Sequence, residues 1–422
     1  MPALLVSKSP PLSGEVAIHG AKNSVLPILA ATLLCRTPCV LHNCPDILDV
    51  THTRAILHSL GCASERRGAS VYIDPRSCAG HSIPPELAAS MRASSLFLGA
   101  LLARQGEASL SLPGGCPIGA RPVDYHLLAF RALGAEVTET DDTIHCRARR
   151  LTGAKITLPG PSVGATENAM LAAVGADGVT VIENAACEPE IVDLAGFLTA
   201  CGAKIAGAGT GRVTVKGGQP LTGATYTILP DRIETATFLC ACAACGGTLT
   251  LRRTAPRLAE PILNSLTESG CRFSCTHDTI QIFRDGPLIA CRPVVSKPYP
   301  GFPTDAMPVL LASQLRAEGQ TDFTETIFEN RFGYARELKK LGAQLRQDEN
   351  TVHLRGAPQL YAAQLFAEDL RGGAALVLAA MQAEGESTIF GVKHIERGYD
   401  TLEAALQSVG ARLKTVEIPK KM

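Results

Sequence analysis

The chain contains the stretch Asp124-Tyr-His-Leu-Leu-Ala-Phe-Arg-Ala-Leu-Gly134-Ala. Its apolar residues recur every three or four positions, which predicts an amphipathic helix, and the glycine supplies a helix C-cap. The same ending recurs at intervals of 68 to 73 residues in Leu60-Gly61, Leu133-Gly134, Cys201-Gly202, Ser269-Gly270, Leu341-Gly342 and Val409-Gly410. Six copies with a period of about 70 residues predict a protein built from repeats.

Each repeat holds a second helical pattern and several short alternating segments. The second helix is rich in Ala, Leu, Cys and Met and has few charges, so we expect it to be buried on nearly all sides. A β-branched run follows it, as in Val179–Ile182, and further alternating segments, such as Arg212–Val215, predict strands. The second helices are expected over Arg92–Gly106, Gly164–Gly178, Arg232–Gly246, Asp305–Gly319 and Arg371–Gly385. The predicted class is therefore α/β, with the unit helix, strand, helix, strand, strand.

A unit of this size is too small to be a domain, whereas three units packed around one set of buried helices form a lobe of ordinary size. We expect one lobe over residues 22–229 and a second over residues 1–21 plus 230–422, with the N-terminal strand Val16–Ile18 in the second. Clefts between lobes are a preferred place for ligands, so the active site is expected there.

Composition excludes several classes of protein. The 422 residues carry 40 Lys+Arg and 40 Asp+Glu, which leaves no excess of cations for general nucleic-acid binding. No apolar run approaches the ~20 residues of a membrane span, and no secretory signal is visible, so a cytoplasmic protein is expected. Its 15 scattered cysteines are interpreted as reduced thiols. For Cys242 and Cys245, core packing is favoured over metal binding, because no second Cys pair or His cluster has ligand spacing.

Cationic residues occupy matching places in the repeats. At or beside the start of the buried helix are Lys22, Arg92, Arg232 and Arg371, with Asp305 at the equivalent place. At the start of the amphipathic helix are Arg121, Arg257, Arg331 and Arg397. A helix N-terminus disfavours a cation unless an anion lies nearby. Local acids can serve Arg232 and Arg257, but for Arg121, Arg331 and Arg397 a bound multiply charged anion is the favoured interpretation.

The loop Ser111–Asp124 is rich in Gly and Pro, which predicts a shaped loop of the kind that closes over a substrate. It contains Cys116, with Arg121 five positions later. A nearby cation and an exposed position lower the pKa of a thiol and make it reactive. The alternative is an inert loop cysteine.

Ten short motifs run nearly from end to end of the chain: Gly20–Ser24, Met91–Ser94, Leu112–Asp124, Ser162–Thr166, Glu183–Asp193, Leu229–Thr235, Phe302–Asp305, Glu325–Arg331, Asp369–Arg371 and His394–Tyr399. In this order and spacing they resemble the UDP-N-acetylglucosamine 1-carboxyvinyltransferase (enolpyruvyl transferase) family of the EPSP synthase superfamily. The resemblance implies a two-lobed inside-out α/β barrel of six repeats.

The resemblance also implies the reaction. The enolpyruvyl group of phosphoenolpyruvate would pass to the 3′-hydroxyl of UDP-N-acetylglucosamine by addition and elimination, with release of phosphate, as the first committed step of peptidoglycan precursor synthesis. These two small molecules are the expected partners, and no metal or organic cofactor is implied. The antibiotic fosfomycin would alkylate the thiol of Cys116.

Residue roles follow from the same resemblance. Cys116 resembles the proton donor, Asp305 the residue that contacts and can deprotonate the 3′-hydroxyl, and Asp369 a second proton carrier or a partner that orients an arginine. The phosphoenolpyruvate site is implied for Lys22, Asn23, Arg121, Arg331, Arg371 and Arg397, with Lys22 and Arg397 also catalytic. The nucleotide-sugar site is implied for Asn23, Arg92, Arg121, Pro122, Val123, Asp124, Tyr125, Ser162, Val163, Gly164, Asp305 and Ile327.

One departure and three alternatives remain. Gly160 stands where many relatives carry a Lys, so a cation on the diphosphate side is missing or supplied elsewhere. The nearest alternative function is the sister transfer to shikimate 3-phosphate, against which the Cys-bearing loop argues. A non-catalytic nucleotide-sugar-binding paralogue would be expected to have lost Cys116, Asp305 or Arg397, all of which are present. A redox or metal protein comes last.

Overall fold

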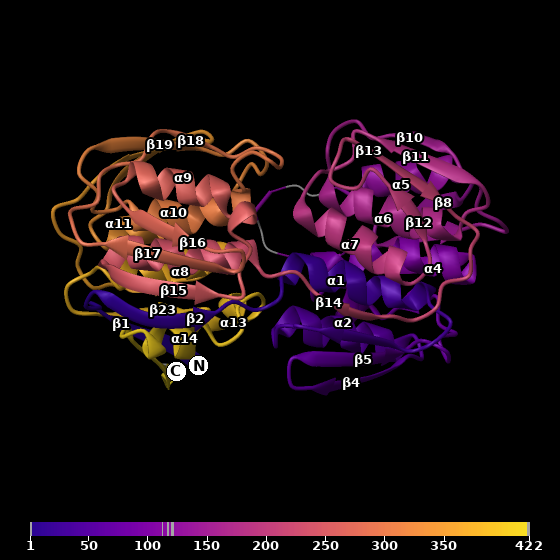
Figure 1. The fold of residues 1–422 in the computed structure, drawn as a ribbon, viewed down its shortest axis with the longest axis horizontal. Helices are drawn as coiled ribbons and strands as arrows, with labels where there is room; N and C mark the ends of the chain where they lie inside the picture. Colours follow the sequence, from indigo (N-terminus) through magenta and orange to yellow (C-terminus); the bar gives the residue numbers. More distant parts are fainter. Residues whose placement is uncertain (1, 112, 116–117, 120–121, 420–422) are drawn as a thin grey trace. The chain divides into compact units, whose positions relative to one another are not determined.

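The computed structural model describes residues 2–111, 113–115, 118–119 and 122–419. The chain divides into two compact units (Figure 1). Unit 1 comprises Met1–His19, Pro117–Ala120 and Pro230–Met422, and unit 2 comprises Gly20–Cys116 and Arg121–Leu229. Within the described residues, each unit contains three four-stranded sheets of one design.

In every sheet a short edge strand pairs in parallel with the next strand, and the two remaining pairings are antiparallel. The sheets of unit 2 run, in spatial order, β14 (Thr225–Thr227), β3 (Cys39–His42), β5 (Ser70–Asp74), β4 (Ala63–Arg67); β6 (Ser82–Ile83), β7 (Glu107–Ser111), β9 (Thr143–Arg147), β8 (Glu136–Glu139); and β10 (Lys155–Thr157), β11 (Val179–Glu183), β13 (Arg212–Lys216), β12 (Lys204–Ala206).

Unit 1 repeats this design. Its sheets are β2 (Leu12–Ala17), β15 (Gly247–Arg252), β17 (Thr279–Arg284), β16 (Arg272–Cys275); β18 (Val294–Val295), β19 (Gln320–Thr324), β21 (Thr351–Arg355), β20 (Gln344–Asp348); and β22 (Gln364–Phe366), β23 (Glu386–Phe390), β1 (Pro2–Ser7), β24 (Arg412–Glu417).

Each unit is closed by a strand from the far end of its own sequence. In unit 2, the last strand β14 pairs with the first strand β3. In unit 1, β1 lies between β23 and β24, with Leu4 opposite Ile389 on one side and Thr415 on the other. The indigo β1 therefore lies among the yellow C-terminal elements in Figure 1. Closure in this way completes one four-stranded sheet in each unit.

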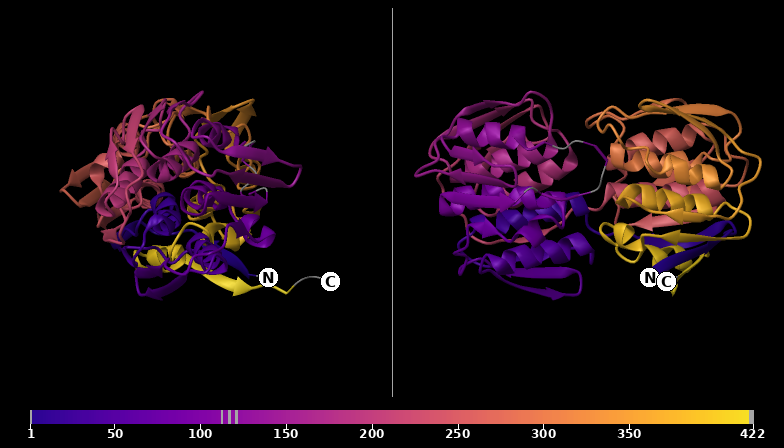
Figure 2. Two further views of the ribbon diagram at one scale, coloured as in Figure 1. Left: turned by 90° about the vertical axis from the view of Figure 1, so that its right-hand side faces the viewer. Right: turned by 180° about the vertical axis from the view of Figure 1, so that it is seen from behind.

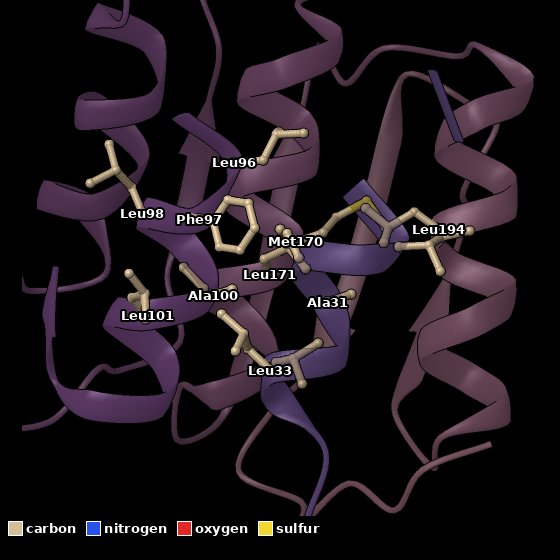
Figure 3. Close-up of a cluster of buried hydrophobic side chains, with 14 of the residues drawn as sticks. Ala31, Leu33, Leu96, Phe97, Leu98, Ala100, Leu101, Met170, Leu171 and Leu194 are labelled. Atoms are coloured by element: carbon tan, nitrogen blue, oxygen red, sulfur yellow. The ribbon is translucent and has the colours of Figure 1, made fainter. Parts of the chain in front are cut away.

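Three buried helices occupy the middle of each unit, and the sheets lie outside them (Figure 2). Those of unit 2 are α1 (Lys22–Ala31), α4 (Phe97–Gln105) and α6 (Val163–Gly175), and those of unit 1 are α8 (Arg232–Cys245), α10 (Met307–Ser313) and α12 (Leu370–Ala380). Small and aliphatic side chains let these helices pack closely, and every residue of α12 is buried. In unit 2, Phe97, Leu101 and Met170 meet in the core with Leu33 (Figure 3). The buried second helix of the predicted repeat is confirmed.

The remaining helices are shorter or lie outside the buried ones. They are α2 (Leu48–Ser59), α3 (Pro85–Ala88), α5 (Asp124–Ala132), α7 (Pro189–Ala200), α9 (Glu260–Glu268), α11 (Ala335–Lys340), α13 (Val392–Glu396) and α14 (Leu402–Ser408), with 3₁₀ turns η1 (Thr32–Leu34), η2 (Arg92–Leu96), η3 (Pro256–Leu258) and η4 (Thr304–Ala306). The six repeated glycines all have φ between 88° and 107°, namely Gly61, Gly134, Gly202, Gly270, Gly342 and Gly410. A residue with a Cβ adopts this conformation rarely, which explains why glycine recurs there and confirms the predicted helix ends.

Four of the five buried helices expected from the sequence differ from their expected ranges: α6 ends at Gly175 and α12 at Ala380, and the other two differ as follows. The helix expected from Arg92 begins as the 3₁₀ turn η2, where the Ser94 hydroxyl donates to the backbone oxygens of Ala88 and Met91. The helix expected over Asp305–Gly319 begins as η4 and its α-helical part ends at Ser313. Beyond that point Gln314 turns its amide to Ser269 and to the backbone of Cys291.

The described cysteines are all free thiols, and most of them are buried. Cys242 is fully buried within α8, where burial raises its pKa to about 12. Over the residues that the structure describes, no cluster of three or more His, Cys, Asp or Glu side chains could hold a metal ion. Within the same residues, no helix is long and apolar enough to cross a membrane.

Candidate active site

Asp305 of unit 1 is the shared partner of two arginines. Nη2 of Arg331 donates to its Oδ1 at 2.8 Å, and Nε of Arg371 donates to its Oδ2 at 3.3 Å. The Asp305 side chain is 25% exposed, whereas those of Arg331 and Arg371 are 3% and 2% exposed. Asp305 lies in η4 and Arg371 in the first turn of α12. The two predicted carboxylate-binding arginines and the predicted base are therefore brought together.

Asp369 is the N-cap of α12. Its Oδ1 accepts hydrogen bonds from the backbone N of Arg371 at 3.0 Å and of Gly372 at 2.9 Å. The same oxygen lies 3.9 Å from Nη1 of Arg331. An N-cap carboxylate fixes the first turn of its helix, so Asp369 holds Arg371 in place through the backbone. This geometry matches the orienting role that was left open beside proton transfer.

The guanidinium groups of Arg331 and Arg371 have N–H donors that no described residue accepts from. Among the described residues, Nε of Arg331 and Nη1 and Nη2 of Arg371 are buried without a hydrogen-bond partner. Burial opposes the charge of Arg371, but Asp305 and Tyr399 outweigh it, so that the pKa of Arg371 is raised. Its guanidinium also lies 5.4 Å from the centre of the Tyr399 ring. Buried unpaired donors are costly, and an anionic ligand would satisfy them.

Arg397 and Ile327 lie on other segments of unit 1. Arg397 follows the last residue of α13, two positions before Tyr399, whose ring faces Arg371. The Ile327 side chain is 38% exposed, which is unusual for a large apolar residue of this protein. Its backbone N donates to Oε1 of Glu325 at 2.7 Å. The loop of Ile327 is therefore anchored by a carboxylate.

Lys22 of unit 2 is the first residue of α1. Its Nζ lies 2.9 Å from Oδ2 of Asp49, at the start of α2, and the two side chains are 12% and 2% exposed. The buried Asp49 carboxylate orients the ammonium and balances its charge. Sequence reasoning placed Lys22 in the site but missed Asp49, which no motif marked.

Two of the predicted nucleotide-sugar residues of unit 2, Gly164 and Arg92, lie near His126 of α5. Ser162 is the N-cap of α6 and accepts from the N of Ala165 at 3.4 Å. A Cβ placed on Gly164 would lie 3.1 Å from Cε1 of His126, so this glycine lets the start of α6 approach the ring. Burial lowers the pKa of His126 to about 3, and the charge of Arg92 acts in the same direction.

Asn168 links these segments further. Its Nδ2 lies 2.6 Å from Nδ1 of His126 and also donates to the backbone oxygen of Ser95 at 2.9 Å. Its Oδ1 accepts from the N of Gly99 at 2.8 Å. The fully buried Asn168 thus ties η2, which begins with Arg92, to α5 and α6. Neither His126 nor Asn168 was identified from the sequence.

The other predicted residues fall as follows. Asn23 follows Lys22 in α1, Val163 opens α6, and the segment before and into α5 holds Pro122, Val123, Asp124 and Tyr125. Val123 is buried and Pro122 is exposed. A Cβ on Gly160 would meet no atom within 4 Å. Cys116 and Arg121 lie outside the described residues, so the thiol and this arginine have no place in the geometry above.

Comparison with known proteins adds independent information. Residues 6–406 match the model of the EPSP synthase (3-phosphoshikimate 1-carboxyvinyltransferase) family. The chain is 46% identical over 400 residues to UDP-N-acetylglucosamine 1-carboxyvinyltransferase 2 of Caldanaerobacter subterraneus subsp. tengcongensis, with 95% of this chain and 96% of that protein covered.

Solved structures give the same result for the fold. The enolpyruvyl transferase NikO from Streptomyces tendae is similar with a TM-score of 0.89 and 26% identity, over 99% of both chains. EPSP synthase from Acinetobacter baumannii is similar with a TM-score of 0.74 and 17% identity, over 99% of this chain and 100% of that one. The inside-out α/β barrel expected from the motifs is confirmed.

Proposed function

The chain belongs to the UDP-N-acetylglucosamine 1-carboxyvinyltransferases of the EPSP synthase family and is an enolpyruvyl transferase, and from this premise we propose its substrates and residue roles. The enolpyruvyl group of phosphoenolpyruvate passes to the 3′-hydroxyl of UDP-N-acetylglucosamine, and inorganic phosphate is released. In the cell this reaction supplies the precursor of peptidoglycan and takes place in the cytoplasm.

The observation that carries the proposal is the set of unpartnered donors beside Asp305. Nε of Arg331 and Nη1 and Nη2 of Arg371 are buried and lack a hydrogen-bond partner among the described residues. Asp305 accepts hydrogen bonds from the other donors, Nη2 of Arg331 and Nε of Arg371. A planar carboxylate such as that of phosphoenolpyruvate can accept from such donors. The same arrangement would hold the substrate carboxylate close to the group assigned to the 3′-hydroxyl.

The proposed chemistry has two stages. The Cys116 thiol gives its proton to C3 of phosphoenolpyruvate, and C2 becomes oxocarbenium-like. The 3′-oxygen then attacks C2, and its proton passes to Asp305, which yields a tetrahedral ketal. In the second stage a proton passes from C3 to Asp369, the second proton carrier, while the bond from C2 to the phosphate oxygen breaks. Lys22, Arg121 and Arg397 hold the phosphate and stabilise the negative charge with which it leaves.

Asp369 is assigned to both roles that the family resemblance leaves open, with the orienting role supported by its cap on α12. The nucleotide sugar is assigned to the segments tied together by Asn168 and His126, together with Asn23 and Ile327.

Phosphate release tests the proposal. The protein is incubated with phosphoenolpyruvate and either UDP-N-acetylglucosamine or shikimate 3-phosphate, and inorganic phosphate and the mass of the product are measured. We expect phosphate and an enolpyruvyl adduct only with the nucleotide sugar. Turnover with shikimate 3-phosphate would show that the protein catalyses the sister reaction instead. Binding of the nucleotide sugar without turnover would indicate a non-catalytic relative.

A further inference from the structure

Glu325 is a buried carboxylate directly after β19 with an unusual set of partners. The residue is 2% exposed. Its Oε1 accepts from Oγ of Ser296 at 2.7 Å, from N of Ile327 at 2.7 Å and from N of Phe328 at 3.2 Å. Its Oε2 accepts from Oγ1 of Thr304 at 2.7 Å. Four donors therefore converge on one ionisable side chain to which no role has been given.

Two of these partners adjoin residues assigned to the substrates. Thr304 immediately precedes Asp305 in η4, and its backbone oxygen accepts from Nη2 of Arg331 at 3.4 Å. Ile327 is the exposed apolar residue assigned to the nucleotide sugar. One carboxylate thus fixes both the turn that presents Asp305 and the loop that presents Ile327.

We propose that Glu325 is a positioning residue, which holds Asp305 through the Thr304 hydroxyl and holds Ile327 through the backbone amides of the loop. This inference rests on the proposed function, because it assigns both positions to the same acceptor sugar. Glu325 acts through its neighbours and does not touch the reacting atoms. It affects catalysis by holding the base, Asp305, and the sugar contact, Ile327, in the correct positions relative to the 3′-hydroxyl.

A carboxylate suits this task better than a neutral side chain. It has only acceptors, so every neighbouring N–H and O–H must orient toward it, and bonds to a charged acceptor are stronger than neutral ones. Ser296 adds rigidity, because its Oγ also accepts from the N of Thr326 at 2.8 Å while it donates to Glu325. The result is a loop whose backbone has few alternative arrangements.

A purely structural role for Glu325 is the competing explanation. Its backbone N donates to the oxygen of Asn350 at 2.8 Å, and its backbone oxygen accepts from Nδ2 of Asn350 at 2.9 Å. These bonds stabilise the junction of the sheet whatever side chain position 325 carries. The test must therefore change the link to Asp305 and leave this junction intact.

Thr304→Val removes the hydroxyl that links Glu325 to the turn of Asp305 and keeps the shape of the side chain. We expect kcat for phosphate release to fall about 10- to 100-fold, because small displacements of a reacting group have effects of that size. The Kd of UDP-N-acetylglucosamine should stay within about twofold of wild type, since this variant leaves the amides of Ile327 and Phe328 on Glu325. Thr304→Ser restores the hydroxyl and should recover most of the activity.

Thr321→Val is the matched control. Thr321 is a buried residue of β19 whose hydroxyl lies 3.9 Å from Sγ of Cys291, away from Asp305. The control should lower the unfolding midpoint by the ordinary cost of removing a buried hydroxyl, while kcat stays at the wild-type value.

Glu325→Gln is a second test variant, in which an amide N replaces one carboxylate oxygen. In this variant kcat should fall and the KM of UDP-N-acetylglucosamine should also rise.

Each outcome is decisive. Thr304→Val with wild-type kcat, or Thr304→Ser as impaired as Thr304→Val, would overturn the positioning role while the proposed function stood. Wild-type protein that releases no phosphate from the two substrates would instead overturn the proposed function, and the positioning role would fall with it.

Discussion

Nη2 of Arg331 donates a 2.8 Å hydrogen bond to Oδ1 of Asp305, which links a buried guanidinium group directly to the proposed base. The pair is completed on its other side by Arg371, so two cations surround one carboxylate. A substrate carboxylate that enters here meets donors already aligned by the protein. This relationship between the cations and the acid underlies the first two predictions.

Asp305→Asn keeps the size of the side chain and removes its charge and basicity. If Asp305 accepts the 3′-hydroxyl proton, we expect kcat for phosphate release to fall about 10²- to 10⁴-fold, the usual contribution of a general base. Asp285→Asn is the control, because Asp285 is 80% exposed and forms a surface pair with Arg272. Equal kcat in wild type and Asp305→Asn would remove Asp305 from the proton transfer.

Arg371→Lys keeps a positive charge but cannot present two parallel donors. Because Nη1 and Nη2 are the buried groups left for a ligand, we expect the KM of phosphoenolpyruvate to rise by at least about tenfold. Arg346→Lys changes an exposed arginine paired with Asp348 and should behave as wild type. An unchanged KM in the Arg371 variant would exclude Arg371 from carboxylate binding.

Cys116→Ser tests the thiol, which lies outside the described residues. We expect turnover to fall at least about 10²-fold, because a hydroxyl is a far weaker acid, while calorimetry should show UDP-N-acetylglucosamine binding largely intact. Cys116→Asp should retain activity, since a carboxylic acid can also donate a proton.

Fosfomycin gives a second measurement on the same residue. The epoxide should inactivate the wild-type protein and add its mass to the peptide that contains Cys116, with no adduct on the Cys116→Ser variant. An unmodified Cys116 under saturating drug would contradict the assignment of a reactive thiol.

Gly160→Lys introduces a cation at the position where the family resemblance implies one. The space is open, because a Cβ at this position would meet no atom within 4 Å. We expect the KM of UDP-N-acetylglucosamine to fall about three- to tenfold at low salt through attraction to the diphosphate, with the gain reduced at high salt. Gly160→Met has a similar length without charge and should show no gain. If Gly160→Lys and Gly160→Met have the same KM for UDP-N-acetylglucosamine, the diphosphate does not bind near position 160.

The buried His126 should make stability dependent on pH. Its folded pKa of about 3 lies below the unfolded value near 6.5, so only the unfolded state takes up a proton as the pH falls between these values. The free energy of unfolding should therefore decrease by about 2 kcal/mol from pH 7 to pH 5 through this group. His126→Gln should lose that part of the decrease in urea titrations.

His277→Gln serves as its control, because the His277 side chain is 91% exposed. It should keep the wild-type difference in stability between the two pH values. If His126→Gln shows that same difference, His126 is protonated in the folded protein and burial does not keep it neutral.

The repeats could be predicted because each one carries its own local signals. A glycine such as Gly134 ends each amphipathic helix with a positive φ, and the next strands alternate in pattern. These signals act over a few residues, so they are visible without knowledge of the fold. The pairing of β1 with β24 was beyond their reach, because Leu4 and Thr415 come together only through the closure of unit 1.

The candidate site likewise contains residues that local sequence signals predict and residues that they do not. Arg331, Arg371 and Asp305 stand out as charges near helix starts, and the structure unites them. Asp49 and Asn168 escaped notice because a buried acid and a buried amide have no characteristic spacing. Their importance comes from partners on other elements, Lys22 and His126, which only the tertiary structure reveals.

The place of β1 between β23 and β24 imposes an order on biosynthesis. Unit 2 has all its strands once Thr227 has left the ribosome, so it can fold while synthesis continues. In unit 1, β1 can be paired on both sides only after β23 and β24 have been synthesised. Until then β1 is an apolar strand with unpaired edges in the nascent chain, and such a strand is prone to pair with other chains unless it is covered.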